Sequence, residues 1–233
     1  MSEKVQDDIL SYREMCDAEG VQTLQRGMNF RMNPRYSVIL MSQRPNAPYH
    51  DKVDGVTIEY EGHDEPKRGY DREYNPKVKD QPERTTNGTL TQNGYFLEAV
   101  REYKESEKSP EVVKVYEKIL PGVWSLKGYF SLIDSKIVHD GNRNVYRYSL
   151  QLMEFDGSDK SNDVELGHTR LIPSEVKKEV WKRDNGRCVM CGATTNLHFD
   201  HDLPFSRGGT SLSASNVKLL CLKHNLQKSD KIE

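Results

Sequence analysis

Hydrophobic and polar positions divide the chain into a long β-rich part and a short C-terminal part. One run between the β-like segments, 93–106, has Phe96, Val100 and Tyr103 at helical spacing, with Asn93 as a candidate N-cap. Short runs rich in Val, Ile, Tyr and Phe, separated by Gly, Asn and Pro, predict strands at 36–42, 55–62, 111–119, 128–136 and 144–153. The first part is therefore predicted to be α+β and mostly strand.

Two segments lack periodic apolar positions. Residues 63–84 combine charge with Pro, which predicts a functional loop rather than a core element. Residues 156–171 are polar and acidic, which predicts a linker. We therefore expect a domain at 1–155, a linker at 156–171 and a second domain at 172–233. Beyond the linker, Ser174 is the candidate N-cap of a short helix.

Composition is that of a polar protein, with 35% hydrophobic and 30% charged residues among 233. No window has the apolar length of a membrane span, and the first residues carry charges where a secretory signal needs an apolar stretch. We expect an intracellular, cytoplasmic protein with no membrane partner. Residues 167–233 hold 11 Lys and Arg against 7 Asp and Glu, a modest positive balance that suits a polyanion partner or an ordinary solvated surface.

The cysteines change this picture, because three of the four cluster near the C-terminus. Cys188 and Cys191 form a Cys-x2-Cys pair, and Cys221 and His224 form a Cys-x2-His pair. Two such pairs supply the four ligands that tetrahedral structural zinc needs. Two alternatives stay open: ordinary buried cysteines beside a surface histidine, or His224 as the ligand of a catalytic ion beside an incomplete zinc site.

Between the two pairs lies a second motif. Asp200-His201, Pro204, Gly208-Gly209, Asn216 and the run HNLQK at 224–228 together resemble the HNH, or ββα-metal, endonuclease family over residues 172–233. The resemblance implies that Asp200 and Asn225 bind a catalytic divalent ion, that His201 is the general base, and that Asn216 ties the loop that orients His201. Oxygen ligands favour Mg²⁺ or Mn²⁺ over zinc.

This set of residue types suits phosphodiester hydrolysis. The reaction needs an activated water, positive charge on the scissile phosphate and help for the departing oxygen, which one ion and one imidazole can supply. An ordinary histidine pKa near ~6.5 suits a base at neutral pH. Arg207 and Lys228 are candidate phosphate contacts, with a purely solvated role as the alternative.

The first part of the chain resembles a different family. The order of its runs, including SVILMSQRPNAPYHDKVDGVTIEYEGHD and NGYFLEAV, is similar to the SRA domain over residues 20–155. That resemblance implies an SRA/PUA-like β-barrel with flanking helices that reads 5-methylcytosine in DNA by base flipping.

The same resemblance assigns residues to the flipped base. Tyr49 and Tyr60 match the two tyrosines that sandwich the base, and Gly62 matches the glycine after the second. Asp51 is the candidate partner of the exocyclic amine, with Asp54 and His50 as alternatives. The competing interpretation is that Tyr49 and Tyr60 are ordinary aromatic residues of the core.

Together the two motif sets predict a type IV-like restriction endonuclease that cleaves DNA carrying 5-methylcytosine or 5-hydroxymethylcytosine. Double-stranded modified DNA is the expected partner, a homodimer the expected assembly, and the prokaryotic cytoplasm the expected location. Two rivals remain. One is an HNH endonuclease without modification preference, and the other is a non-catalytic zinc-knuckle DNA-binding protein.

Overall fold

The computed structural model describes residues 9–24, 27–43, 47, 49–66, 74–106, 108–153, 171–203 and 209–229. The chain forms two compact units. The sheet unit comprises Thr23–Val115 and Tyr129–Met153, and the Cys/His unit comprises Met1–Gln22, Tyr116–Gly128 and Glu154–Glu233. The residues before 23 and those at 116–128 thus group with the C-terminal part, whereas the predicted boundaries placed them in the first domain. Of the predicted linker, only Leu171 lies within the described residues.

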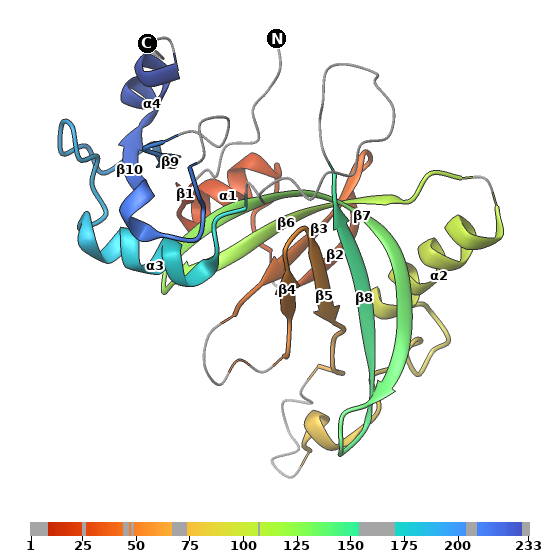
Figure 1. The fold of residues 1–233 in the computed structure, drawn as a ribbon. Helices are drawn as coiled ribbons and strands as arrows, with labels where there is room; N and C mark the ends of the chain where they lie inside the picture. Colours follow the sequence, from red (N-terminus) through yellow and green to blue (C-terminus); the bar gives the residue numbers. More distant parts are fainter. Residues whose placement is uncertain are drawn as a thin grey trace. The chain divides into compact units, whose positions relative to one another are not determined.

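A large sheet contains most of the described strands. Its order is β2 (Met28–Asn33), β3 (Tyr36–Met41), β6 (Glu111–Leu120), β7 (Val123–His139), β8 (Asn144–Leu152), β5 (Thr57–Glu61) and β4 (Lys52–Asp54), and β1 (Ile9–Leu10) pairs with β7 (Figure 1). The five predicted runs all form strands, which confirms that part of the prediction. In the described part of the chain β2 and β4 are the outer strands of this order, and closure into a barrel stays a prediction.

Burial on these strands follows the apolar positions that predicted them. The core of the sheet unit includes Val38, Ile39, Ile58, Tyr60, Phe96, Val100, Val113, Phe130, Leu132, Tyr148 and Leu150. Three strands were not predicted, because β1 and β4 are only two and three residues long and β2 lacks β-branched residues. The described part of the predicted loop at 63–84 contains one short 3-10 helix, η1 (Pro76–Val78).

Helix α2 (Gln92–Glu105) has its N-cap two residues before the predicted cap, Asn93. Thr91 is the N-cap, and its side chain accepts a hydrogen bond from the Gly94 backbone N–H. Asn93 lies inside the first turn and is 1% exposed, so its prediction as the cap is wrong. Its side-chain amide bonds to the backbone of His63 instead, a tertiary contact that local pattern does not reveal.

The Cys/His unit contains a ββα arrangement. Strand β9 (Leu197–His201) pairs antiparallel with β10 (Val217–Cys221), and α4 (Leu222–Ser229) follows β10 directly. Its other described elements are β1, α1 (Tyr12–Ala18), the 116–128 portions of β6 and β7, α3 (Ser174–Arg183) and the 3-10 helix η3 (Ala214–Asn216). Its core includes Ile172, Val176, Val180, Cys188, Leu197, Phe199, Ala214, Val217, Leu219 and Leu220.

A buried polar cluster joins α3 to the β6 and β7 residues of the same unit. The Glu117 carboxylate pairs with Lys127 at 2.9 Å, and both side chains are 1% exposed. Lys177 on α3 is fully buried and donates to the Ser125 hydroxyl at 3.0 Å. Ser174 donates to Glu117, so its prediction as a helix N-cap is wrong, and Pro173 occupies that position.

Within the described residues, no helix is long and apolar enough to cross a membrane.

Candidate metal centre and aromatic cluster

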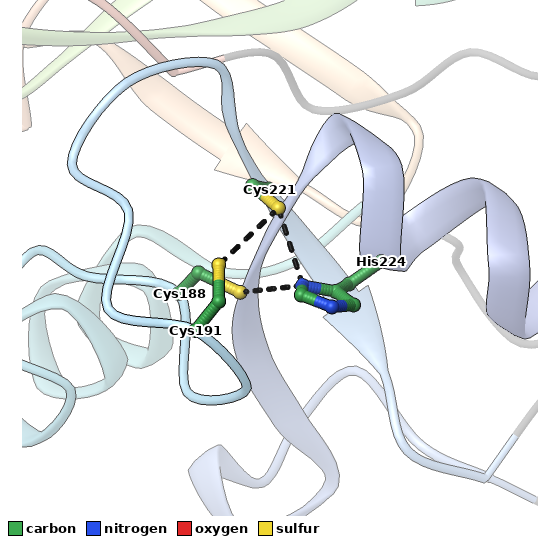
Figure 2. A group of neighbouring side chains, drawn as sticks. All are labelled: Cys188, Cys191, Cys221 and His224. Carbon is green, nitrogen blue, oxygen red and sulfur yellow. Dashed lines mark hydrogen bonds between the residues drawn. The ribbon is translucent and has the colours of Figure 1, made fainter.

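Four side chains of the Cys/His unit converge on one point. Cys188 and Cys191 come from the turn before β9, Cys221 ends β10 and His224 lies in the first turn of α4 (Figure 2). Their ligand atoms all lie within 4.8 Å of one another. The sequence pairs Cys-x2-Cys and Cys-x2-His are thus brought together as a single quartet.

The spacing of these atoms fits a tetrahedral ion. Zn–S bonds of about 2.3 Å and Zn–N bonds of about 2.0 Å place two sulfurs roughly 3.8 Å apart and a sulfur and a nitrogen roughly 3.5 Å apart. Cys191 Sγ and Cys221 Sγ are 3.8 Å apart. His224 Nδ1 lies 3.4 Å from Cys188 Sγ and 3.3 Å from Cys221 Sγ. Three thiols and one imidazole fit zinc in both chemistry and size.

The Cys188 thiol is primed to lose its proton. Burial raises its pKa, but hydrogen bonds from the backbone of Cys221, Met190 and Cys191 and from the His224 side chain outweigh burial and lower the pKa to about 6. Metals bind the thiolate rather than the thiol. The hydrogen bonds of this turn therefore favour the thiolate form of Cys188, which is the form that binds metal.

The same turn is shaped by local backbone bonds. The Cys188 N–H donates to Ala193 at 2.8 Å, and Gly192 has a φ of +76°, which glycine adopts without strain. The Val189 N–H donates to the Leu219 carbonyl at 3.0 Å, which attaches the turn to β10. The quartet therefore holds the start of the hairpin against the start of α4.

Asp200 and His201 are the last two residues of β9, where the strand ends. His201 Nε2 lies 2.8 Å from the hydroxyl of Ser211, which is 1% exposed. The Asp200 carboxylate accepts from the ammonium of Lys228 on α4, which also donates to the His201 carbonyl. Lys228 was expected at phosphate or in solvent, and the structure places it on the predicted metal ligand.

Asn216 ties together the two ends of the segment after β9. Its Oδ1 accepts from the Leu203 N–H at 2.8 Å, and its Nδ2 donates to the Leu203 and Thr210 carbonyls at 3.1 and 3.0 Å. These three hydrogen bonds hold the two ends of that segment together. Gly209 lies beside it, where a Cβ would stand 1.8 Å from the Leu203 carbonyl oxygen. Pro204, Arg207 and Gly208 lie outside the described residues.

Asn225 is 7% exposed on α4, and that helix packs against both β9 and β10. Arg183 at the end of α3 supports the hairpin by donating to the carbonyls of Ala214 and Val217 at 2.6 and 2.7 Å. Asp184 accepts from the Leu219 N–H at 3.0 Å. Helices α3 and α4 therefore both support the β9–β10 hairpin, whose first strand carries Asp200 and His201.

In the sheet unit, the two predicted tyrosines meet at a residue that sequence reasoning did not assign. The His63 ring stacks on Tyr49, with centroids 5.6 Å apart and planes 13° apart. His63 Nε2 lies 3.3 Å from the Tyr60 hydroxyl. We call Tyr49, Tyr60 and His63 the aromatic cluster. Tyr60 is 2% exposed and Tyr49 is partly exposed, so only one of the two has the burial of a core residue.

Asp51 hydrogen-bonds to Glu61, the residue after Tyr60, and its charge acts on Tyr60. Its carboxylate accepts from the Glu61 N–H at 3.0 Å. Burial is the main reason that its pKa rises to about 7. Burial likewise raises the pKa of Tyr60 well above its ordinary value, and Asp51 is the largest charged contributor. Of the two alternatives, Asp54 is exposed, and the His50 ring lies 3.4 Å from Glu61.

Gly62 occupies a position where no side chain fits. A Cβ there would lie 2.7 Å from both Asn93 Oδ1 and Gln81 Oε1. Gln81 donates to the Gly62 carbonyl at 2.7 Å and is 5% exposed. The glycine that matched the SRA pattern is thus required here by two buried amides.

No protein-family model and no curated protein matches the chain. Solved structures of SRA domains are similar to it. The SUVH5 SRA domain in complex with hemi-methylated CG DNA aligns at a TM-score of 0.44 and 15% identity, covering 70% of this chain and 95% of that one. The same domain bound to fully hydroxymethylated CG DNA aligns at 0.43 and 13%, covering 70% and 97%.

KRYPTONITE in complex with mCHG DNA and SAH aligns at a TM-score of 0.44 and 17% identity over 68% of this chain, which spans 34% of that protein. Similarity at this level assigns neither a binding site nor an activity.

Proposed function

We propose that this chain is a modification-dependent DNA endonuclease. The sheet unit recognises 5-methylcytosine or 5-hydroxymethylcytosine in duplex DNA by base flipping, and the Cys/His unit hydrolyses a phosphodiester bond. One observation carries the proposal: the β9–β10 hairpin runs directly into α4, and a four-ligand Cys/His quartet joins the turn before β9 to the start of α4. Asp200 and His201 are the last two residues of β9, and Asn225 lies on α4.

The quartet has a structural role in this proposal. Four protein ligands leave a tetrahedral ion no open position for water or substrate, which is the mark of a structural rather than a catalytic zinc site. The interpretation of His224 as a catalytic-ion ligand is disfavoured, because its Nδ1 lies beside two of the sulfurs. Catalysis then falls to the residues at the end of β9.

His201 is the proposed general base. Its hydrogen bond with the Ser211 hydroxyl fixes the ring orientation, as a positioned imidazole requires. Asn216 is a positioning residue, because its amide closes the segment that runs from Leu203 to Thr210 and so supports Ser211. In-line attack needs the water that His201 deprotonates to lie opposite the departing oxygen.

Asp200 and Asn225 are the proposed ligands of a divalent cation. When bound, Mg²⁺ or Mn²⁺ would supply positive charge to the scissile phosphate and to the departing oxygen. The hard oxygen donors fit such an ion in chemistry. Lys228 must then leave the Asp200 carboxylate, and a phosphate oxygen is a suitable new partner for its ammonium.

Base recognition is assigned to the aromatic cluster and Asp51. Aromatic faces such as those of Tyr49 and Tyr60 hold a flipped base by stacking, and a carboxylate accepts from the exocyclic amine of cytosine. Lys77 adds positive charge 3.9 Å from the Tyr49 ring centroid. The expected partner is double-stranded DNA, and the expected assembly is a homodimer in a prokaryotic cytoplasm.

Digestion of matched duplexes tests this function. Otherwise identical DNA carrying cytosine, 5-methylcytosine or 5-hydroxymethylcytosine is incubated with the protein and Mg²⁺ or Mn²⁺, with an EDTA control. We expect cleavage of modified DNA only, abolished by EDTA. His201→Ala should lower cleavage by a factor on the order of 10² to 10⁴ while binding persists. His139→Ala, at an exposed histidine of the sheet unit, should cleave normally.

The pairing of Lys228 with Asp200 favours a second candidate, a non-catalytic zinc-knuckle DNA-binding protein. An ammonium already neutralises the carboxylate there, so the module needs no further cation for charge balance. That candidate predicts binding of modified DNA without cleavage under every divalent ion. Equal cleavage of modified and unmodified DNA would instead indicate a nuclease without modification preference.

A further inference from the structure

Lys228 places its ammonium group on two oxygen atoms at the end of β9. Its Nζ donates to the Asp200 carboxylate and to the His201 carbonyl. The Lys228 side chain is 28% exposed and the Asp200 side chain 21% exposed, so water screens this pair less than it screens a fully exposed one. The negative charge of Asp200 is therefore already neutralised from within the chain.

The ammonium and the proposed ligands of the divalent ion belong to one group of side chains. Lys228 lies one turn after Asn225 on α4, and residues three apart on a helix share a face. Asn225 is 7% exposed, and α4 packs against β9. Oxygen atoms of the kind that Lys228 contacts are also the donors that Mg²⁺ and Mn²⁺ prefer. The ammonium and a divalent ion therefore compete for Asp200.

A second ion pair adds positive charge to the same end of the hairpin. Lys218 on β10 lies opposite Asp200 in the strand register, and its Nζ donates to the Asp202 carboxylate. The two acids and the two lysines of these pairs have charges that sum to zero. A divalent cation that approaches Asp200 therefore meets two ammonium groups, and the four side chains offer it no excess of negative charge.

We propose that Lys228 is an internal cation that keeps divalent ions from Asp200 until a DNA phosphate draws its ammonium away. The inference rests on the proposed function, in which Asp200 and Asn225 bind the catalytic ion. A phosphodiester supplies the missing negative charge and offers the ammonium new oxygen acceptors. DNA and the divalent ion therefore bind cooperatively, and by linkage each raises the affinity for the other by the same factor.

Lys228→Met isolates the effect of the ammonium, because it keeps a long unbranched side chain and removes the charge. Without DNA, the variant should bind Mn²⁺ about 10- to 100-fold more tightly than the wild type, since the Asp200 carboxylate is then available to the ion. DNA should raise the Mn²⁺ affinity of the wild type and should raise that of Lys228→Met by a smaller factor. Lys228→Arg keeps a positive charge and should bind Mn²⁺ as weakly as the wild type.

Electron paramagnetic resonance of free Mn²⁺ measures these affinities with the full chain and does not depend on cleavage. Protein supplied with one equivalent of zinc is titrated with Mn²⁺ alone and with a saturating duplex that carries 5-methylcytosine. The proteins compared with and without DNA all carry His201→Ala, so that the duplex stays intact, and a titration of the duplex alone is subtracted. Lys223→Met is the matched control, because it removes the same charge from an exposed position of α4. Thermal unfolding establishes that each variant is folded.

The outcomes separate this proposal from the function on which it rests. Tighter and less DNA-dependent Mn²⁺ binding by Lys228→Met, with Lys223→Met unchanged, is the expected result. If Lys228→Met binds Mn²⁺ as the wild type does and gains equally from DNA, Lys228 does not exclude the ion, although the cation site itself remains. If no protein binds Mn²⁺ even on DNA, the cation site of the proposed function is refuted. Equal tightening in Lys223→Met would assign the effect to net charge rather than to the contact with Asp200.

Discussion

Single side-chain amides do much of the positioning in this protein. Asn93 holds the backbone of His63, Gln81 holds Gly62, and Asn216 joins Leu203 to Thr210. A carboxamide has both a donor and an acceptor, so one side chain can satisfy two backbone groups of a segment that has no strand partner. Both candidate sites therefore rest on residues that take no part in the proposed chemistry.

Asp51 gives a pH dependence at the residue scale. Burial raises its pKa to about 7 from an ordinary value of 3.8, so the folded state favours the protonated form. The stability that it contributes is fully present below about pH 4 and is lost as the pH rises to 7, by on the order of 4 kcal/mol at most.

We therefore expect Asp51→Asn to flatten the decline of stability between pH 4 and pH 7, as measured by urea unfolding monitored by tyrosine fluorescence. Asp54→Asn is the matched control, because that side chain is exposed and should leave the wild-type pH profile unchanged. Parallel profiles for the wild type and Asp51→Asn would contradict the raised pKa.

At the scale of elements, the Cys/His quartet links the turn before β9 to α4, so metal loss should loosen those elements first. We expect one zinc per chain by elemental analysis. Removing it with a strong chelator should speed amide hydrogen exchange in β9, β10 and α4 while β3 and β8 stay protected. Cys188→Ser should reproduce the effect without chelator.

Met190→Ala is the matched control for the metal centre, because Met190 lies in the same turn and is 66% exposed. It should bind zinc normally. A chain purified without any metal whose hairpin is nonetheless protected from exchange would show that the quartet is not a structural metal site.

The buried cluster at α3 supports a second prediction for an element. Burial raises the pKa of Glu117, but Lys127, Lys177 and Ser174 outweigh it and hold that pKa below its ordinary value. Glu117→Gln leaves two buried ammonium groups without their carboxylate, which should cost about 3–5 kcal/mol of unfolding free energy. Chemical denaturation measures the loss.

Glu175→Gln is the control, because that carboxylate is 80% exposed in its pair with Lys178 and contributes less than about 1 kcal/mol. The pKa of Glu117 is lowered in the folded state. The stability that Glu117 contributes is therefore present above the ordinary carboxyl pKa and is lost as the pH falls through the folded-state pKa. Equal effects of the two substitutions would show that the buried cluster is not coupled as described.

At the scale of the whole molecule, one chain contains one proposed nuclease site, and duplex DNA has two strands. If the enzyme acts as a homodimer, the rate of linear product formation from a plasmid should fall with the square of enzyme dilution, whereas nicking should fall in proportion. Mixing wild type with His201→Ala should yield nicked circles. Linear product that forms in proportion to enzyme concentration and is undiminished by an excess of His201→Ala would contradict this assembly.

Most of the longer elements and the local motifs could be predicted from the sequence. Alternating Val, Ile and Tyr predicted strands, and spacings of two to three residues predicted the ligand quartet that Figure 2 shows. These signals are local, because side chains within a few residues share a face or a turn whatever the rest of the chain does. The ββα order could be expected from the same motifs.

Contacts between residues far apart in the sequence could not be predicted. His63 lies 30 residues before Asn93, Lys228 lies 28 residues after Asp200, and Ser174 lies 57 residues after Glu117. No periodicity encodes such pairs, since they arise when whole elements pack. The same physical reason explains the wrong helix caps: Asn93 and Ser174 are short polar residues at helix starts, yet each gives its side chain to a distant partner.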